Sequence, residues 1–192
     1  MEFNNVVKKR KSVRAFTGKK ASWKSVLDAI EIANHGPFAG NINGLKFLII
    51  EEQETIKKIA KFSEQTWISQ AGILVLVCSD ETHLENMYGE RGRIYSRQQA
   101  GAAIYAFLLK IAELGLGACW VGAYTDERIK EILEIPQNIQ IEAIIPIGHE
   151  DKKNSEDKPD KKELENVIYW ETWKNDKRPS IFKEPKDPLA LK

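Results

Sequence analysis

The spacing of apolar residues along the chain predicts its helices and strands. Apolar positions three and four residues apart predict helices, which we place from Phe3 into the basic residues 8–14, over 22–34, over 54–62, over 98–114, and from Thr125 or Asp126 to just before Pro136. Continuous apolar runs predict strands at 46–50, 72–79, 117–121 and 139–147. The run 72–79 is apolar throughout, so we expect both of its faces to be covered. On the second helix, the side chains expected to be buried are Trp23, Val26, Leu27, Ile30 and Ala33.

Three segments lack such a pattern. Residues 80–97 are polar, with scattered aromatic residues and glycines, so we predict a loop there. Residues 151–162 are charged and loop-like, and residues 174–192 carry three prolines and are predicted to lack a fold of their own. Because helices and strands are interspersed without strict alternation, the pattern predicts an α+β fold rather than a doubly wound one.

The composition is that of an ordinary globular protein. The 192 residues suffice for one sizeable core, 42% of them are hydrophobic, and the formal net charge is +1. So small a net charge gives no large attraction for nucleic acid or for an anionic membrane, and we expect neither partner. Cys78 and Cys119 lie within apolar runs, as core cysteines of a reducing compartment do, and no apolar run approaches membrane length. We therefore expect a soluble cytoplasmic protein.

Two kinds of site are not favoured by the sequence. The stretch GLGACW (115–120) starts like a dinucleotide-binding fingerprint. It carries Trp120 at the third glycine position, however, and it follows a predicted helix instead of opening one. His35, His83 and His149 are far apart in the sequence, so we expect no metal site.

Residues 10–14 combine basic and hydroxyl side chains in an alternating pattern. In an extended chain Arg10, Ser12 and Arg14 point to one side. Two guanidinium groups and a hydroxyl on one side suit a phosphate monoester dianion. The same residues also suit the solvated basic end of a helix, which needs no ligand, and both interpretations stay open.

The connection 35–45 is uncharged in a chain of which 30% is charged. It contains three glycines, one proline and the amide side chains of Asn41 and Asn43. Amides and freely approachable backbone N–H groups can hydrogen-bond the edge of a flat heterocycle, beside which unpaired charges would be desolvated. The alternative is a tight loop that only reverses the chain.

Four stretches together are similar to one known family. They are RKSVRAF (10–16), GPFAGN (36–41), AGAAIYAFLLKIAELGLGACWVGAY (100–124) and IPIGHE (145–150). In this order they resemble the nitroreductase family of flavoproteins, over most of residues 3–173. The resemblance implies an α+β fold with a central mixed sheet flanked by helices, in a homodimer whose C-terminal segments embrace the partner subunit. It also implies a single FMN-binding domain over 1–173 and a C-terminal extension over 174–192.

The resemblance further implies which residues bind FMN. Those expected around the phosphate are Arg10, Lys11, Ser12, Arg14 and either Lys161 or Lys162. Those expected to approach from the loop of the other subunit are Pro37, Phe38, Ala39, Asn41 and Asn43. The backbone contacts near flavin N5 are expected from Val121, Gly122 and Ala123. Gln99 stands where family members frequently carry an acidic residue, and it completes the expected set.

The side chains expected to cover the flavin and form the substrate pocket are Phe38, Met87, Tyr88 and Tyr95. Phe38 stands where family members often have serine, and Asn43-Gly44-Leu45 stands where they often have Gln-Pro-Trp. These departures leave the substrate preference open. Arg91 and Arg93 lie in the same segment. They either attract an anionic substrate or the phosphate of NAD(P)H, or belong to a solvated loop.

The function implied by the resemblance is an FMN-dependent oxidoreductase. It would pass electrons from NAD(P)H, by a ping-pong cycle, to a small organic acceptor such as a nitroaromatic or a quinone. Because flavin N5 carries the chemistry, no catalytic side chain is needed, and the sequence shows no Ser/His/Asp or paired-carboxylate arrangement. The alternatives are a family branch that performs reductive dehalogenation or flavin fragmentation, and a flavin-binding sensor or interaction protein without turnover.

Overall fold

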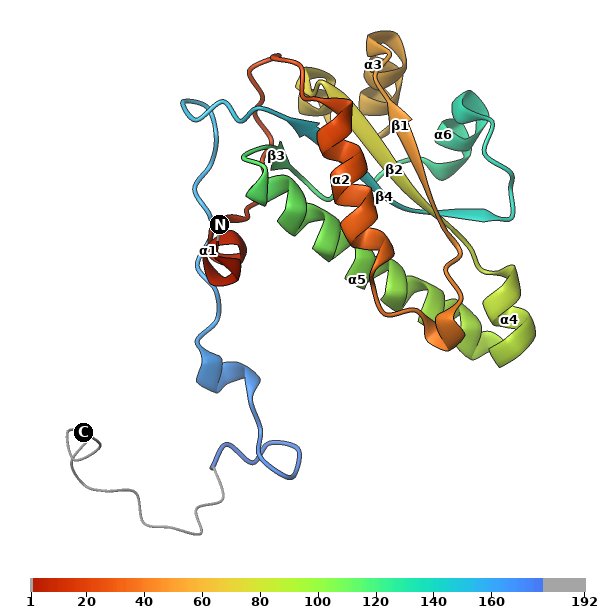
Figure 1. The fold of residues 1–192 in the computed structure, drawn as a ribbon, viewed down its shortest axis with the longest axis vertical. Helices are drawn as coiled ribbons and strands as arrows, with labels where there is room; N and C mark the ends of the chain where they lie inside the picture. The colour runs from red at the N-terminus through yellow and green to blue at the C-terminus, as the bar shows by residue number, and fades with distance from the viewer. Residues whose placement is uncertain (1, 178–192) are drawn as a thin grey trace, which may run out of the picture. The chain divides into compact units, whose positions relative to one another are not determined.

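The computed structural model describes residues 2–177, and the chain forms two units, residues 1–157 and 158–192 (Figure 1). The first unit is built on a four-stranded sheet with the strand order β1-β2-β4-β3. Its strands, all paired antiparallel, are β1 (Leu45–Ile50), β2 (Ile73–Asp80), β4 (Ile139–Gly148) and β3 (Gly117–Ala118). The described part of the second unit contains a short 3-10 helix, η3 (Leu164–Val167). The expected domain boundary at residue 173 stays a prediction, and residues 178–192 of the expected extension lie outside the described residues.

Helices cover both faces of this sheet. The helices of the first unit are α1 (Phe3–Lys9), α2 (Trp23–Asn34), α3 (Gln53–Phe62), α4 (Thr82–Tyr88), α5 (Glu90–Glu113) and α6 (Asp126–Leu133), with the short 3-10 helices η1 (Ala39–Asn41) and η2 (Thr66–Gln70). Two hydrophobic clusters form the core: α2 and α5 pack with one face of the sheet, and α3 and α6 pack with the other. Figure 1 shows α2 and α5 lying side by side across their face.

The central strand β2 joins the two clusters. Its alternate residues Ile73, Val75 and Val77 belong to the cluster of α2 and α5, and Leu74, Leu76 and Cys78 belong to the cluster of α3 and α6. Burying an aliphatic side chain of this size contributes about 1.5–3 kcal/mol. The expected α+β class and the expected cover on both faces of this strand are confirmed. The mixed character expected of the sheet is limited to one parallel bridge, between Ser12 and Ala118.

The prediction of a loop over 80–97 is wrong. The segment forms α4 and the first two turns of α5, which are separated at Gly89, a residue with a φ of +59°. Its polar residues occupy the outer faces of the two helices, while Leu84, Gly92 and Ser96 are buried between elements. The packing of these few buried residues stabilises the two helices, although the segment as a whole is polar in composition.

Two further expectations need correction. The strand predicted at 117–121 ends at Ala118, because the next position in register faces Pro146, which has no N–H to donate. On α2, Trp23 and Leu27 are 48% and 45% exposed instead of buried. The face of α2 that packs against α5 carries small residues, which let the two helices approach closely, so the larger side chains lie outside this contact.

Gly92 marks the closest approach of α5 to α4. A Cβ at this position would lie 2.3 Å from the carbonyl carbon and oxygen of Leu84. These are backbone atoms, so relief of the clash requires a shift of a whole helix. Ser96, one turn later, is also fully buried, and its hydroxyl has no hydrogen-bond partner among the described residues.

We expect Gly92→Ala to lower the free energy of unfolding by about 1–3 kcal/mol, because overpacking against backbone outweighs the helix propensity of alanine, about 1 kcal/mol. The matched control is Ser96→Ala, which adds no atom and removes an unsatisfied hydroxyl. It should leave stability unchanged or raise it by about 1 kcal/mol. Urea denaturation measures both, and a Gly92→Ala protein as stable as the parent contradicts the packing described here.

Candidate functional site

The segment after α1 runs extended along the edge of the sheet beside β3. Ser12 forms a parallel bridge with Ala118, and the Val13 N–H donates a hydrogen bond to the Ala118 carbonyl over 3.0 Å. Val13 is buried, and a Cβ on Gly117 would lie 2.8 Å from its Cγ1 atom. The missing side chain of Gly117 therefore lets the segment lie against the strand. With Val13 turned inward, its neighbours in the alternating pattern point the other way.

The thiol of Cys119 shows where those neighbours lie. Burial raises the pKa of the Cys119 thiol, and three groups act in the opposite direction: the charge of Arg14, the hydroxyl of Ser12 and the charge of Arg10. Electrostatic influence of this kind weakens with distance. The charges of Arg10 and Arg14 and the hydroxyl of Ser12 therefore all lie near enough to act on the same thiol. We call Arg10, Ser12 and Arg14 the basic triad.

Lys11 does not join the basic triad. Its ammonium group pairs with Glu150 Oε1 at 2.8 Å and donates to the Glu156 carbonyl at 2.8 Å. Partial burial opposes ionisation of Glu150, but the hydrogen bond and charge of Lys11 hold the pKa of this carboxyl below its usual value. Arg14 has only a loose contact of 3.7 Å with the exposed Glu156 carboxylate. Lys11 is thus committed to other partners, whereas Arg14 keeps donors for a ligand.

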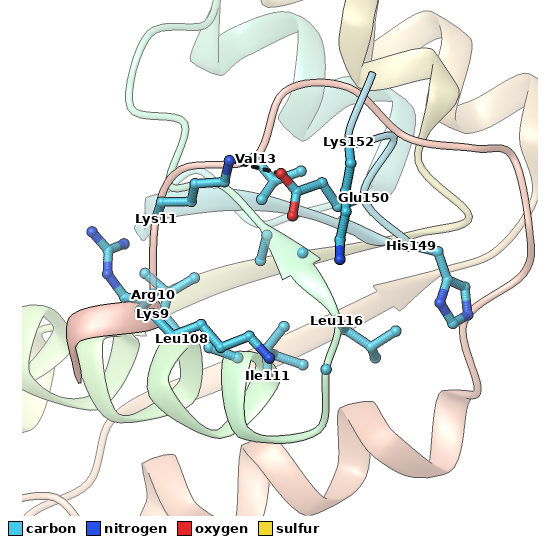
Figure 2. A pocket seen from close by; sticks show the side chains of 14 residues that line it. Lys9, Arg10, Lys11, Val13, Leu108, Ile111, Leu116, His149, Glu150 and Lys152 are labelled. Carbon is cyan, nitrogen blue, oxygen red and sulfur yellow. Dashed lines mark ion pairs between the residues drawn. The ribbon is translucent and has the colours of Figure 1, made fainter. Parts of the chain in front are cut away.

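A cavity of about 360 Å³ lies on the Lys11 side of the segment (Figure 2). Its apolar lining comes from Val13, Leu108, Ile111 and Leu116. Figure 2 shows Lys11 and Glu150 turned toward each other at the wall, whereas the Arg10 side chain points away from them. Lys9 and Arg10 also line the cavity, so of the segment 10–14 the residues Arg10, Lys11 and Val13 border it.

The turn that follows Cys119 is anchored on both sides of Gly122. Val121 exchanges two backbone hydrogen bonds with Ile144, at 2.9 and 3.0 Å. The Ala123 carbonyl accepts a hydrogen bond from Gln65 Nε2 at 3.2 Å. Gly122 is exposed, and no hydrogen bond within residues 2–177 engages its backbone. Of the three residues predicted to offer backbone contacts, Gly122 has both polar groups available, whereas the Val121 N–H is already used.

The loop that contains η1 is held by its own side chains. Gly40 and Asn41 both have a positive φ, near +57°, a conformation that glycine and asparagine tolerate best. Asn43 Nδ2 donates to Asn34 Oδ1 over 2.6 Å, and Asn43 Oδ1 accepts from the Leu45 N–H over 2.9 Å. Both ends of the Asn43 amide are therefore occupied within the loop, and its predicted contact with the flavin stays a prediction.

Gln99 of α5 holds the same loop through two hydrogen bonds. Its Oε1 accepts from the Ala39 N–H and its Nε2 donates to the Ile42 carbonyl, both over 3.2 Å. The side chain is buried, so its polar atoms bond to the backbone of the loop instead of to water. Gln99 thus acts on the site by positioning the backbone of residues 39–42.

Three of the four predicted pocket residues lie beside this loop. Tyr88 and Tyr95 pack edge to face with their ring centroids 5.3 Å apart. A Cβ on Gly40 would lie 2.8 Å from the Tyr88 hydroxyl and 3.4 Å from Met87 Sδ. A hollow of about 230 Å³ lies next to Tyr95, lined also by Pro37, Ala39, Gln98, Gln99 and Ala102. Phe38, in contrast, is half-buried and packs against the core cluster of α2 and α5.

The predicted FMN-binding residues thus form two groups in one chain. The basic triad lies near the C-terminal end of α5, where Ile111 lines the adjoining cavity, and the loop lies against Gln99. Twelve helical residues separate Gln99 from Ile111, which corresponds to about 18 Å. The two groups of predicted residues therefore lie beside different parts of α5.

The remaining predictions concern other parts of the chain. Lys161 and Lys162 belong to the second unit, and their contact with a phosphate stays a prediction. Within residues 2–177, no group of three or more histidine, cysteine or acidic side chains is arranged to hold a metal ion. None of the described helices is long and apolar enough to cross a membrane. The proximity of Cys119 to the basic triad was not predicted, because it depends on the pairing of residues 12–13 with Ala118.

We expect Gln99→Ala to free the loop, because it leaves the Ala39 N–H and the Ile42 carbonyl without partners. The free energy of unfolding should fall by about 1–3 kcal/mol, and amide hydrogen exchange at Ala39 should become faster. The control is Gln98→Ala, the exposed neighbour on the same helix, which should change neither quantity. Unaltered exchange at Ala39 in the Gln99→Ala protein contradicts the positioning role.

Comparison with known proteins identifies the family of the chain. The model of the Nitroreductase family matches residues 7–82 and 61–149. The iodotyrosine deiodinase of Thermotoga neapolitana is 24% identical over 163 residues, which cover 77% of this chain and 88% of that protein. The FMN reductase [NAD(P)H] of Bacillus subtilis is 25% identical over 164 residues, covering 76% and 66% of the two chains.

The fold agrees as well. The solved structure of an FMN-dependent nitroreductase from Clostridium difficile superimposes with a TM-score of 0.74 at 19% identity, covering 88% of this chain and 98% of that one. Because the family match spans more than half of the sequence, the chain belongs to the Nitroreductase family.

Proposed function

We propose that the protein is an FMN-dependent oxidoreductase that transfers electrons from NAD(P)H to a small organic acceptor, such as a nitroaromatic or a quinone. The observation that carries the proposal is the extended segment 10–14, which pairs with Ala118 through Ser12 and Val13. This pairing brings the basic triad near the turn that contains Cys119 and the open backbone of Gly122. Family membership, and relatives named FMN reductase and FMN-dependent nitroreductase, support it.

The basic triad fits FMN in charge and in composition. Two guanidinium groups and a hydroxyl provide several donors for the oxygens of a phosphate monoester. The one carboxylate near Arg14 in the first unit is Glu156, whose contact is long and exposed, so an incoming phosphate displaces little. Beyond Cys119, Gly122 has no side chain, and a flat ring can approach its backbone closely.

When bound, FMN supplies the redox chemistry: hydride uptake from NAD(P)H and two-electron delivery to the acceptor, for example nitro to nitroso with loss of water. The chain's own residues bind and orient. Arg10 and Arg14 neutralise the phosphate, and the Gly122 backbone offers hydrogen bonds to a ring edge. Tyr124 is unsuited as a proton donor, because burial and the nearby Asp126 raise its pKa and its hydroxyl already donates to the Ile141 carbonyl.

We further propose that the site is completed by a second subunit, as a homodimer. The separation between the loop beside Gln99 and the basic triad beside the Ile111 cavity, about 18 Å along α5, supports this. An apolar groove lined by Phe3, Val6, Ile32 and Leu109 also lies open, with Phe3 71% exposed, as expected of an interface. Sedimentation of the FMN-loaded protein measures its oligomeric state, and a monomer that retains FMN contradicts the shared site.

Reductive dehalogenation is a second candidate reaction of the same site. The specific observation in its favour is the similarity to the iodotyrosine deiodinase of Thermotoga neapolitana. Iodide release from 3-iodotyrosine, with chemically reduced protein, separates this reaction from transfer to quinones and nitroaromatics. Bound FMN without turnover of any of these acceptors indicates the remaining alternative, a flavin-binding protein that is not an enzyme.

For cofactor binding, we expect Arg14→Ala to weaken FMN binding about 10- to 100-fold, the loss of one charge-assisted contact of roughly 1.5–3 kcal/mol. The matched control is Arg128→Ala, which removes another exposed guanidinium with a surface ion pair, to Glu131 on α6. It should leave the affinity unchanged. Titration of the apoprotein by flavin fluorescence gives both constants, and equal affinities in the two variants overturn the assignment of the basic triad.

For turnover, we expect NAD(P)H oxidation that depends on an added quinone or nitroaromatic. Because donor and acceptor would use one open site in succession, double-reciprocal plots at several fixed acceptor concentrations should be parallel. Steady-state absorbance at 340 nm measures the rate. Intersecting lines argue against a shared site, and the absence of oxidation with every acceptor argues against the proposed function.

A further inference from the structure

Three arginines lie in the first two turns of α5, and two of them are already neutralised. Arg93 pairs through its Nε with the Glu85 carboxylate, and Arg97 lies 3.6 Å from Glu81. Arg91 is exposed, and no carboxylate within residues 2–177 lies at ion-pair distance from it. Arg91 is thus the arginine of this group whose charge is left for another partner.

The position of this charge is defined by the aromatic pair. The Arg91 guanidinium lies 5.9 Å from the centroid of the Tyr95 ring, one helical turn further on. Tyr95 in turn packs edge to face with Tyr88, whose hydroxyl leaves no space for a side chain at Gly40. The cation, the two rings and the loop therefore form one contiguous surface.

This surface borders the expected acceptor site. Tyr95 lines the hollow of about 230 Å³ together with Pro37 and Ala39 of the loop expected to contact the flavin. The hollow carries no acidic side chain, so nothing in its lining repels an anion. A flat ring in the hollow would contact Tyr95, and the Arg91 guanidinium lies 5.9 Å from the centroid of that same tyrosine ring.

We infer that Arg91 makes the acceptor site selective for aromatic acceptors that carry an anionic group, such as a carboxylate. A guanidinium binds a carboxylate through paired hydrogen bonds, and it does so best where an aromatic neighbour limits its motion. This inference rests on the proposed function and names its class of acceptor. The 2′-phosphate of NADPH is also anionic and would bind a guanidinium through the same chemistry. The test therefore distinguishes this donor phosphate from an anionic acceptor.

The experiment compares two acceptors that differ in charge, 4-nitrobenzoate and 4-nitrobenzamide. For each we measure kcat/KM with NADH in the FMN-loaded parent protein and in Arg91→Gln, Arg91→Glu and Arg93→Gln. Arg91→Gln should lower kcat/KM for 4-nitrobenzoate about 10-fold, mainly through KM, and Arg91→Glu should lower it further. The values for 4-nitrobenzamide should stay within about twofold. Arg93→Gln, which removes an arginine that is already paired, should leave both acceptors unchanged.

Several results overturn the inference. An equal loss for both acceptors shows that Arg91 only supports the local structure, and no loss shows that it is solvated. A loss seen with NADPH but not with NADH, at a fixed neutral acceptor, assigns Arg91 to the donor phosphate. If no quinone or nitroaromatic at all supports NADH oxidation by the parent protein, the proposed function itself fails.

If the proposed function fails, binding measured by calorimetry still tests the inference, because it needs no turnover. Benzoate should bind the parent protein about 10-fold more tightly than it binds Arg91→Gln, and benzamide should bind both equally.

Discussion

The contact between Val13 and Gly117 is the constraint on which the basic half of the site depends. It sets the distance between the segment 11–16 and the edge of the sheet, and it decides which side chains of the segment turn inward. Any side chain at position 117 would push the segment outward. The gathering of Arg10, Ser12 and Arg14 around Cys119 is therefore a result of packing, because nothing in the three polar residues themselves would bring them together.

The other half of the site depends on hydrogen bonds instead. Residues 39–42 have little apolar contact of their own, and the loop is held by amide groups from Gln99 and Asn43. The long helix α5 connects the two parts of the site. Gln99 lies near its middle, and Leu108 and Ile111, which line the cavity beside the basic triad, lie near its C-terminal end. This rigid element keeps the two groups of residues at a fixed separation.

The sequence predicted the sheet, most helices and the family, because these follow from local patterns. The alternation in residues 10–14 and the uncharged loop 35–45 were visible in the same way. The helical structure of 82–97 was not visible, because it depends on contacts of Leu84 and Gly92 within otherwise polar sequence. The exposure of Trp23 and the early end of β3 depend on α5 and Pro146, which lie far away along the chain.

The amide at position 99 has a consequence for the conditions under which the loop keeps its shape. A carboxylic acid there would have to carry its proton in order to donate to the Ile42 carbonyl, and the grip on the loop would weaken as the solution became alkaline. Glutamine donates and accepts irrespective of acidity. The chain thus holds residues 39–42 through an uncharged group, and this loop keeps one geometry across the physiological pH range.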